Sequence, residues 1–316
     1  MTSTMMFSSF TVDDKTRESL SEDLAERLHG QPLDSDRHES ILAGVGSHVL
    51  QQVLDDHILT HLAQFVSNRE RVLLLRNLPV QQLPPTPVEG YADEPALAMT
   101  NAMHLGLVRL CGLTPYSVPY ENDGRLMRNV VPNPQAAAST SSWGSDTDFS
   151  WHTDNPHLPF GFSGVDPRAF IPRYLSFFAM RNEEAVPTDV VSIDAAVDLM
   201  DPLALQVLGE PGFTVGAPAS NDRFQTQPLA PHPLVEISGA DRRVRYDPGT
   251  VTASNPRCEA ALAQWRQALD SLTGEELVLG PGDFLIFDNY RILHRRRAFE
   301  PGPVTQARWL RRCYAS

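Results

Sequence analysis

The chain combines apolar positions at helical spacing near its N-terminus with short apolar runs farther along. Leucines recur every four residues over 13–28 and Gly30 follows, which predicts an amphipathic helix that ends at a glycine. Apolar residues three and four positions apart predict a second helix over 47–66. A stretch rich in Ala, Leu and Met predicts a third, buried helix over 92–111.

Beyond residue 70, short apolar runs bounded by Gly and Pro dominate the sequence. Several are apolar at nearly every position, as expected for strands covered on both faces. We therefore expect one domain over 1–316, with a mainly β core over 70–316 that carries helical insertions and a helical N-terminal extension over 1–70 packed on that core. Strands are expected over 71–76, 234–237, 243–246, 276–279, 282–288 and 305–314, and helices over 192–200, 202–208 and 256–272.

The formal net charge of −13 argues against nucleic acid and anionic membrane surfaces as general partners and leaves small molecules. No stretch approaches the roughly 20 apolar residues that cross a bilayer, and residues 1–12 lack the pattern of a signal peptide. Cys111, Cys258 and Cys313 are widely spaced, which favours neither a disulfide framework nor a thiolate zinc site. These features predict a cytoplasmic protein and leave its oligomeric state open.

Positive charge is concentrated near the C-terminal end of the chain. We expect most of these arginines to lie on solvated strand faces, with Arg308 and Arg312 as the exceptions. The arginines of this region are Arg291, Arg295, Arg296, Arg297, Arg308, Arg311 and Arg312.

One triplet, His-Thr-Asp over 152–154, carries candidate metal chemistry. On an extended strand, residues i and i+2 share a face, so His152 and Asp154 can reach one ion together. His294 is the best candidate for a third ligand. Two His and one carboxylate on one side of a metal, with open positions opposite, is the arrangement associated with non-haem Fe(II) oxygenases. A zinc protein that uses the same three ligands is an alternative.

Three other histidines fit a metal site less well. His157 lies between Pro156 and Pro159, which break a regular strand, so we expect it near the site or at the surface rather than on the metal. His57 and His61 lie four positions apart on an expected helix, but no third ligand with matching spacing lies nearby.

Arg308 follows His294 by fourteen positions (308 − 294). Arginine can hold a carboxylate through two hydrogen bonds, and it stays charged in a partly buried site. This combination resembles the iron(II)/2-oxoglutarate oxygenases, specifically the clavaminate synthase-like branch that includes hydroxylases of free amino acids. In that family an H-x-D/E triplet and a distal His hold iron, and an Arg about fourteen residues beyond the distal His binds the far carboxylate of 2-oxoglutarate.

Two further segments carry the resemblance, which covers roughly residues 70 to 316. The sequence DNYRILHRRRAF over 288–299 looks like the family's D-N-x-R-x-x-H-G-R-x-x-F segment, with Arg295 in place of the usual Gly. Residues 178–182 followed by Thr188 look like the strand and the Thr whose hydroxyl assists co-substrate binding. The resemblance implies a distorted double-stranded β-helix, a jelly-roll form, with the metal at the barrel mouth.

The same resemblance implies the chemistry. Fe(II) would be held by His152, Asp154 and His294, and 2-oxoglutarate would chelate it while Arg308 and Thr188 fix the far carboxylate. Reaction with O2 would yield succinate and carbon dioxide and lead to hydroxylation of an unactivated C–H bond. Because the related halogenases lack the carboxylate ligand that is present here, hydroxylation is favoured over halogenation, while desaturation and cyclisation stay possible.

A free amino acid is the implied substrate. Arg312 matches a family position that holds the substrate's α-carboxylate, and Glu121 or Asn122 is a candidate contact for the amino group, although both could simply serve a turn. Asp247 would suit a cationic or amide-bearing side chain, but Asp-Pro-Gly is also a common turn sequence. The Ala/Ser-rich stretch over 134–148 is expected to form a flap over the site. A non-catalytic barrel that binds a small carboxylate remains a further alternative.

Overall fold

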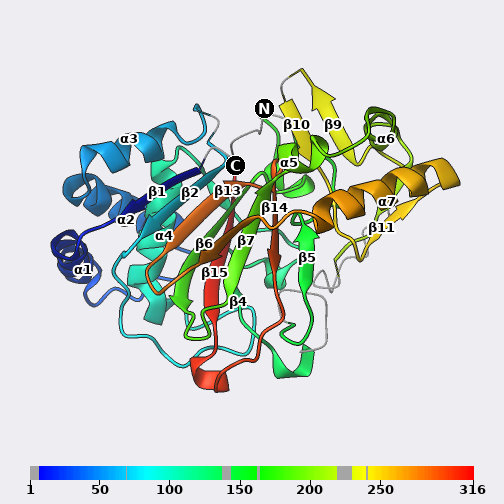
Figure 1. The fold of residues 1–316 in the computed structure, drawn as a ribbon. Helices are drawn as coiled ribbons and strands as arrows, with labels where there is room; N and C mark the ends of the chain where they lie inside the picture. The colour runs from blue at the N-terminus through cyan, green and yellow to red at the C-terminus, as the bar shows by residue number, and fades with distance from the viewer. Residues whose placement is uncertain (1–6, 69, 137–143, 162–163, 219–229, 240) are drawn as a thin grey trace.

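Two β-sheets with helices outside them dominate the described part of the chain (Figure 1). The structure is a computed structural model, and it describes residues 7–68, 70–136, 144–161, 164–218, 230–239 and 241–316. The large sheet has the strand order β1-β2-β13-β6-β15-β3, with β4 also paired to β15, and the small sheet has the order β12-β7-β14-β5. Two shorter sheets pair β10 with β9 and β11 with β8.

The elements have the following bounds. The α-helices are α1 (Asp14–Leu28), α2 (Glu39–Val53), α3 (Asp56–Gln64), α4 (Ala98–Leu110), α5 (Ile193–Val197), α6 (Pro202–Leu208) and α7 (Pro256–Asp270). The strands are β1 (Phe7–Thr11), β2 (Val72–Arg76), β3 (Pro115–Tyr116), β4 (Arg128–Val130), β5 (Phe149–His152), β6 (Tyr174–Arg181), β7 (Pro187–Ser192), β8 (Phe213–Val215), β9 (Val235–Ser238), β10 (Asp241–Val244), β11 (Val251–Ala253), β12 (Glu275–Val278), β13 (Phe284–Asp288), β14 (Ile292–Arg296) and β15 (Trp309–Ala315).

The apolar side chains form three packed layers. On β13, Phe284 and Ile286 pack in the layer that holds helices α1 to α4, whereas Leu285 and Phe287 point to the opposite face and pack between the two sheets. On the outer face of the small sheet, Leu293 packs with helices α5 to α7. The large sheet is therefore covered on both faces, which explains why its strands are apolar at nearly every position.

The expected mainly β core with outer helices is confirmed, and so are helix α1 and strand β2. The expected single helix over 47–66 is wrong, because the chain is extended at Leu54 and Asp55 then caps a new helix, α3, by accepting a hydrogen bond from the backbone N–H of His57. Strand β1 was not predicted and pairs in parallel with β2. No helix of the described residues is long and apolar enough to cross a membrane.

The C-terminal strand differs from the prediction in its start and in its arginines. A single 3-10 turn occupies Val304–Gln306, so β15 begins only at Trp309, one residue after Arg308. Arg311 is not solvated as expected but fully buried, where it pairs with Glu94 and contacts the amide of Asn101 on α4. The expectation failed because helix α4 covers this face of the strand and supplies polar partners there.

Candidate active site

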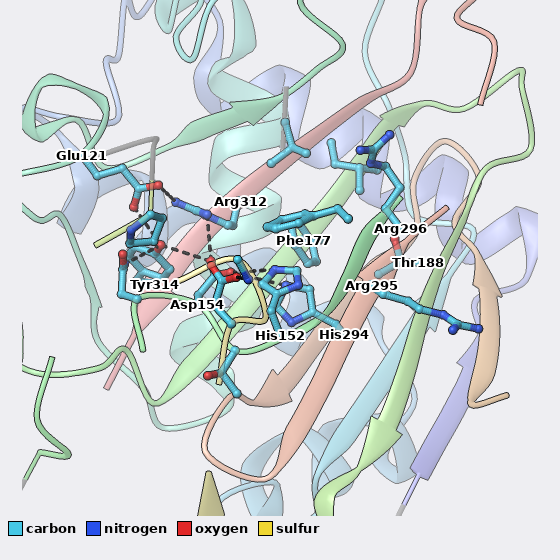
Figure 2. Close-up of a pocket in the computed structure, with 18 of the residues that line it drawn as sticks. Glu121, His152, Asp154, Phe177, Thr188, His294, Arg295, Arg296, Arg312 and Tyr314 are labelled. Carbon is cyan, nitrogen blue, oxygen red and sulfur yellow. Dashed lines mark hydrogen bonds and ion pairs between the residues drawn. The ribbon is translucent and has the colours of Figure 1, made fainter. Parts of the chain in front are cut away.

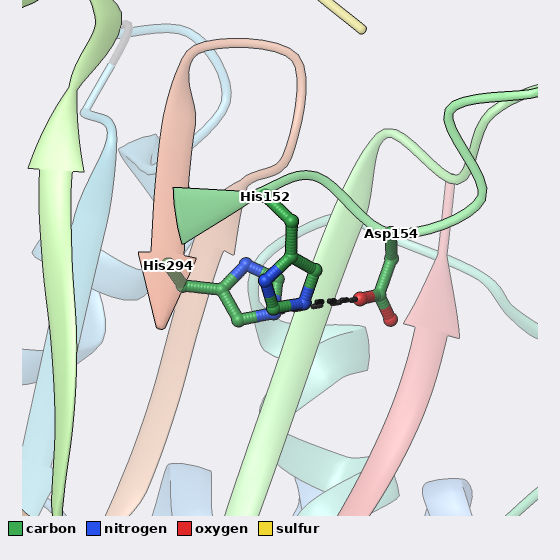
Figure 3. Close-up of side chains that lie close together, drawn as sticks. All are labelled: His152, Asp154 and His294. Carbon is green, nitrogen blue, oxygen red and sulfur yellow. Dashed lines mark ion pairs between the residues drawn. The ribbon is translucent and has the colours of Figure 1, made fainter. Parts of the chain in front are cut away.

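Neighbouring strands of the small sheet bring the two histidines of the predicted metal site together. His152 is the last residue of β5 and lies directly opposite His294 of β14 in the antiparallel register. Asp154 follows two positions after His152, where the chain has left the strand. All three side chains converge on one point (Figure 3). The prediction that these distant residues meet is confirmed, since they form a group whose ligand atoms all lie within 4.8 Å of one another.

The distances within this group suit a single ion. Oδ1 of Asp154 lies 3.6 Å from Nε2 of His152 and 3.4 Å from Nε2 of His294. Ligand atoms about 2.1 Å from a first-row metal lie roughly 3 to 3.5 Å apart at neighbouring coordination positions. Among the described residues, this is the one group of three or more His, Cys, Asp or Glu that meets this requirement.

The protonation states also suit a metal. Nδ1 of His152 lies 2.8 Å from the carbonyl oxygen of Ser150, so Nδ1 carries the proton and Nε2 keeps a lone pair for an ion. Among the described residues, the buried Nε2 has no hydrogen-bond partner, as expected of an atom reserved for a ligand. Burial, with repulsion from His152, lowers the pKa of His294 to about 4, so this imidazole is neutral at pH 7.

Asp154 remains an anion although it is buried. Desolvation by itself would raise the pKa of its carboxyl group, but the Arg312 guanidinium, together with the two nearby imidazoles, outweighs that effect and holds the pKa well below its usual value. Nη1 of Arg312 donates to Oδ2 at 2.8 Å, and the hydroxyl group of Tyr314 lies 3.2 Å from the same oxygen. One carboxylate oxygen is thus held by the protein while the other faces the histidines.

Asn289, in the D-N-x-R part of the motif, fixes the backbone of Asp154. Its Oδ1 accepts a hydrogen bond from the N–H of Asp154 at 2.9 Å, and its Nδ2 donates to the carbonyl oxygens of Asp154 at 3.1 Å and Pro172 at 2.9 Å. The N–H of Thr153 donates to the carbonyl oxygen of Tyr246 at 2.9 Å. The chain between the two triplet ligands is therefore held from two directions although it is no longer part of a strand.

Glu121 and Arg312 form a buried ion pair beside the metal group (Figure 2). Nη2 of Arg312 donates to Oε1 of Glu121 at 2.6 Å, and the hydroxyl group of Tyr314 lies 2.8 Å from Oε2. Arg128 adds a second guanidinium to Glu121. A cation and an anion, both less than a tenth exposed, thus stand side by side at the pocket wall.

These groups line a cavity of about 300 Å³, a size that accommodates a small ligand. Elsewhere in the cavity, Nη2 of Arg308 donates to the hydroxyl group of Thr188 at 3.0 Å, so the structure brings these two predicted residues together. Arg308 is 4% exposed, and burial together with repulsion from Arg296 lowers its pKa to about 9. It still carries its charge at pH 7.

Of the remaining residues predicted to bind substrate, one lines the cavity and one belongs to a turn outside it. Asp247 lines the cavity, and its Oδ1 also accepts the N–H of Gly249 at 2.8 Å, so it stands at the site and in a turn. The amide of Asn122 points away from this cavity and donates to the carbonyl oxygen of Met127 at 3.0 Å, in a turn where Asn122 has a positive φ. Residues 137–143 of the expected flap lie outside the described residues.

His157 is buried and does not belong to the metal-binding group of the described residues. It lies edge-on to the ring of Tyr120, and burial lowers its pKa to about 4. The expectation that it would not join the metal group is confirmed, but the possibility that it lies at the surface is wrong. His57 and His61 form no such group with any described residue either.

The sequence analysis did not assign Tyr314, Arg296 or Phe149 to the site, although all three line the cavity. Tyr314 lies two positions after Arg312, and Arg296 lies two positions after His294, so the alternation of side chains along a strand would have assigned both to the cavity face. Phe149 stacks on His152 with ring centroids 3.7 Å apart, and only the fold shows this contact. The expectation that Arg296 would be solvated is wrong, because this side chain is 6% exposed, and it is wrong for Arg291 too, which is 8% exposed.

Comparison with known proteins agrees with this geometry. Residues 31–314 match the family model described as taurine catabolism dioxygenase TauD, TfdA family. The chain belongs to this family. This dioxygenase is 30% identical to clavaminate synthase 2 of Streptomyces clavuligerus over 262 residues, which cover 79% of the chain and 75% of the relative. It is 23% identical to enduracididine beta-hydroxylase of Streptomyces hygroscopicus over 273 residues, which cover 78% and 76% of the two chains.

A solved structure shares the fold of this chain. Asparagine oxygenase, in complex with Fe(II), 2S,3S-3-hydroxyasparagine and succinate, superposes on 97% of this chain and 92% of its own with a TM-score of 0.81 and 23% identity. The family predicted from the sequence is thus confirmed, and the chain is a dioxygenase of the iron and 2-oxoglutarate class. Two imidazole nitrogens and one carboxylate oxygen facing a cavity fit the ion that this class uses.

Proposed function

We propose that this dioxygenase hydroxylates an unactivated C–H bond of a free amino acid or a similar small molecule. The observation that carries the proposal is that the metal group, Arg308 with Thr188, and the Arg312–Glu121 pair all line one cavity of about 300 Å³. The first group suits an iron ion, the second a diacid co-substrate and the third a zwitterion. The printed names of the relatives, a hydroxylase and an asparagine oxygenase among them, support the same reaction type.

We further propose that the two sheets form a double-stranded β-helix core and that 1–316 is a single oxygenase domain. Face-to-face packing of the large and small sheets through one apolar layer supports this core. The pairing of β1 with β2 and the packing of helices α1 to α4 on the large sheet support a single domain that includes the N-terminal segment. The His152–His294 pair then occupies one end of the space between the sheets.

In this proposal His152, Asp154 and His294 hold Fe(II), and Arg308 with Thr188 holds the far carboxylate of 2-oxoglutarate. When bound, iron and 2-oxoglutarate convert dioxygen into an oxidant strong enough to remove hydrogen from an unactivated C–H bond. The protein contributes position and charge. Arg312 and Tyr314 keep the outer oxygen of Asp154 engaged, which leaves Oδ1 aimed at the ion.

The substrate's α-amino acid head would meet the ion pair beside the metal. The guanidinium of Arg312 suits an α-carboxylate, and the carboxylate of Glu121 suits an α-ammonium group. Because Arg128 and Tyr314 also hold Glu121, this carboxylate is already oriented before a substrate arrives. The amide of Asn122 is directed elsewhere, so Glu121 is the better candidate of the two.

Asp247 would determine which amino acid side chains the cavity accepts. It lines the cavity as a half-buried carboxylate, and among the described residues one of its oxygens has a backbone partner, the N–H of Gly249. A cationic or amide-bearing side chain would meet the other oxygen. Amino acids such as lysine, arginine, asparagine and glutamine are therefore the favoured substrates over purely aliphatic ones.

The test is anaerobic loading of the protein with Fe(II) and 2-oxoglutarate, followed by oxygen and a panel of common amino acids. Succinate and any product that has gained one oxygen atom are measured by mass spectrometry. We expect coupled succinate and hydroxylated product with at least one polar amino acid. Products that have lost two hydrogen atoms instead would favour desaturation or cyclisation.

Two variants serve as controls. His152→Ala should abolish both metal binding and turnover, whereas Asp247→Asn should keep the metal and lose preference for a cationic substrate. Turnover that survives His152→Ala, or activity with zinc in place of iron, would contradict the proposed oxidation. Activity confined to small aliphatic amino acids would reject the role of Asp247.

A further inference from the structure

A second buried arginine lines the cavity beside Arg308. Arg296 is 6% exposed and, like Arg308, lines the cavity that contains the metal group. In Figure 2 it lies beside Thr188, the hydroxyl partner of Arg308. Because Arg296 follows His294 by two positions on β14, the same strand face that presents a metal ligand also presents this guanidinium.

Most of the hydrogen-bonding capacity of Arg296 is unused. Its Nη2 donates to the carbonyl oxygen of Thr147 at 3.3 Å, and its guanidinium lies 5.2 Å from the ring centroid of Phe299. Nε and Nη1 are buried and have no hydrogen-bond partner among the described residues, and the same holds for Nε of Arg308. Two neighbouring guanidiniums therefore share one buried region with several donors left unsatisfied.

The two carboxylates that act electrostatically on these arginines each hold a backbone N–H group through one oxygen, and Oε2 of Glu184 is buried without a hydrogen-bond partner among the described residues. Asp148 influences Arg296 electrostatically, but its Oδ1 accepts the N–H of Ala298 at 2.6 Å. Glu184 influences Arg308, but its Oε1 accepts backbone N–H groups, including that of Arg308 itself at 3.2 Å. No carboxylate of the described residues lies within ion-pair distance of either guanidinium. A buried cation without a counter-charge destabilises the folded protein, so the arrangement favours binding of an anion from solution.

We infer that Arg296 is a second arginine of the co-substrate site, so that this chain holds the far carboxylate of 2-oxoglutarate between two guanidiniums and the hydroxyl group of Thr188. A carboxylate has two oxygens with about four acceptor positions, which is enough for donors from both arginines and the threonine. The inference rests on the proposed function and goes beyond it by assigning a selective role to Arg296: preference for a diacid over a monoacid of equal length.

The experiment compares two ligands that differ only at their far end. Protein loaded with Mn(II) in place of iron is titrated calorimetrically with 2-oxoglutarate and with 2-oxopentanoate, which has a methyl group where 2-oxoglutarate has its far carboxylate. We expect Arg296→Gln to weaken 2-oxoglutarate binding at least tenfold, or about 1.4 kcal/mol, and 2-oxopentanoate binding less than threefold. Arg296→Lys keeps the charge and should recover part of the loss.

Arg295→Gln is the matched control. Arg295 is the adjacent arginine of the same strand and also lines the cavity, but its guanidinium is occupied, because it pairs with Asp189 and stacks on the ring of Trp151. Its replacement should change the affinity for 2-oxoglutarate less than threefold. Thermal unfolding and the metal content of each variant establish that the site is intact, and if Arg296→Gln does not fold, the lysine variant carries the comparison.

The outcomes separate the inference from the proposed function. Wild-type protein that binds neither ligand overturns the proposed function. Wild-type protein that binds 2-oxoglutarate with an affinity unchanged by Arg296→Gln overturns only the role of Arg296. An equal loss of affinity for both ligands would make Arg296 a structural residue, and that result also rejects the inference.

Discussion

Replacing Asn289 tests how the fold holds a metal ligand that no longer lies on a strand. Asn289 is fully buried and makes three hydrogen bonds to backbone groups, two of them to Asp154. In Asn289→Ala these groups are left buried without partners. At about 0.5 to 1.5 kcal/mol for each hydrogen bond, we expect a loss of about 1.5 to 4.5 kcal/mol in the free energy of unfolding.

The same variant should lose metal affinity, because the carboxylate of Asp154 is aimed through its backbone. Residues that orient metal ligands change metal affinity by about 10- to 100-fold when they are replaced. We therefore expect the dissociation constant for Mn(II) or Fe(II), measured by anaerobic titration, to rise within that range. Urea unfolding of the metal-free protein measures the loss of stability separately.

Asn182→Ala is the matched control for this prediction. Asn182 is also buried and also makes three hydrogen bonds to backbone groups, of Val186 twice and Leu279 once, but it does not line the cavity. It should lose similar stability and keep the metal affinity of the wild-type protein. If both variants bind metal equally well, or if Asn289→Ala is as stable as the wild-type protein, the reasoning about the Asp154 backbone is refuted.

Three further predictions concern charge. Burial lowers the pKa of His104 to about 3, below its value near 6.5 in the unfolded chain, so between pH 8 and pH 5 only the unfolded chain binds this proton. The free energy of unfolding should therefore fall by about 2 kcal/mol over this range. His104→Gln should lack this part of the fall when unfolding is measured with urea. Arg308→Gln should weaken 2-oxoglutarate binding about 10- to 100-fold in calorimetry without loss of metal. Arg311→Ala should leave buried Glu94 unpaired and lower the free energy of unfolding by about 3 to 5 kcal/mol, whereas joint replacement by Met and Leu should restore most of it.

The metal site could be predicted from the sequence because its residues belong to two short motifs. The His-x-Asp triplet is a short-range arrangement, and His294 and Arg308 belong to one motif with a fixed spacing, so recognising it needed no knowledge of the fold. The helical and strand periodicities likewise gave the outer helices and the β core, since each depends only on which residues alternate along the chain. The break between α2 and α3 and the late start of β15 were missed because single turns and caps interrupt an otherwise continuous pattern.

Which side chains pair with one another, by contrast, was decided by the tertiary structure. No pattern in the sequence pairs Arg312 with both Glu121 and Asp154, places Asn289 against the Asp154 backbone or leaves Arg296 unpaired in the cavity, because each outcome depends on strand register and on which faces are covered. The sequence by itself thus determined most of the element types, the family and the residues able to hold an ion. The register of distant strands determined which charges are buried together, and so what each of those residues can bind.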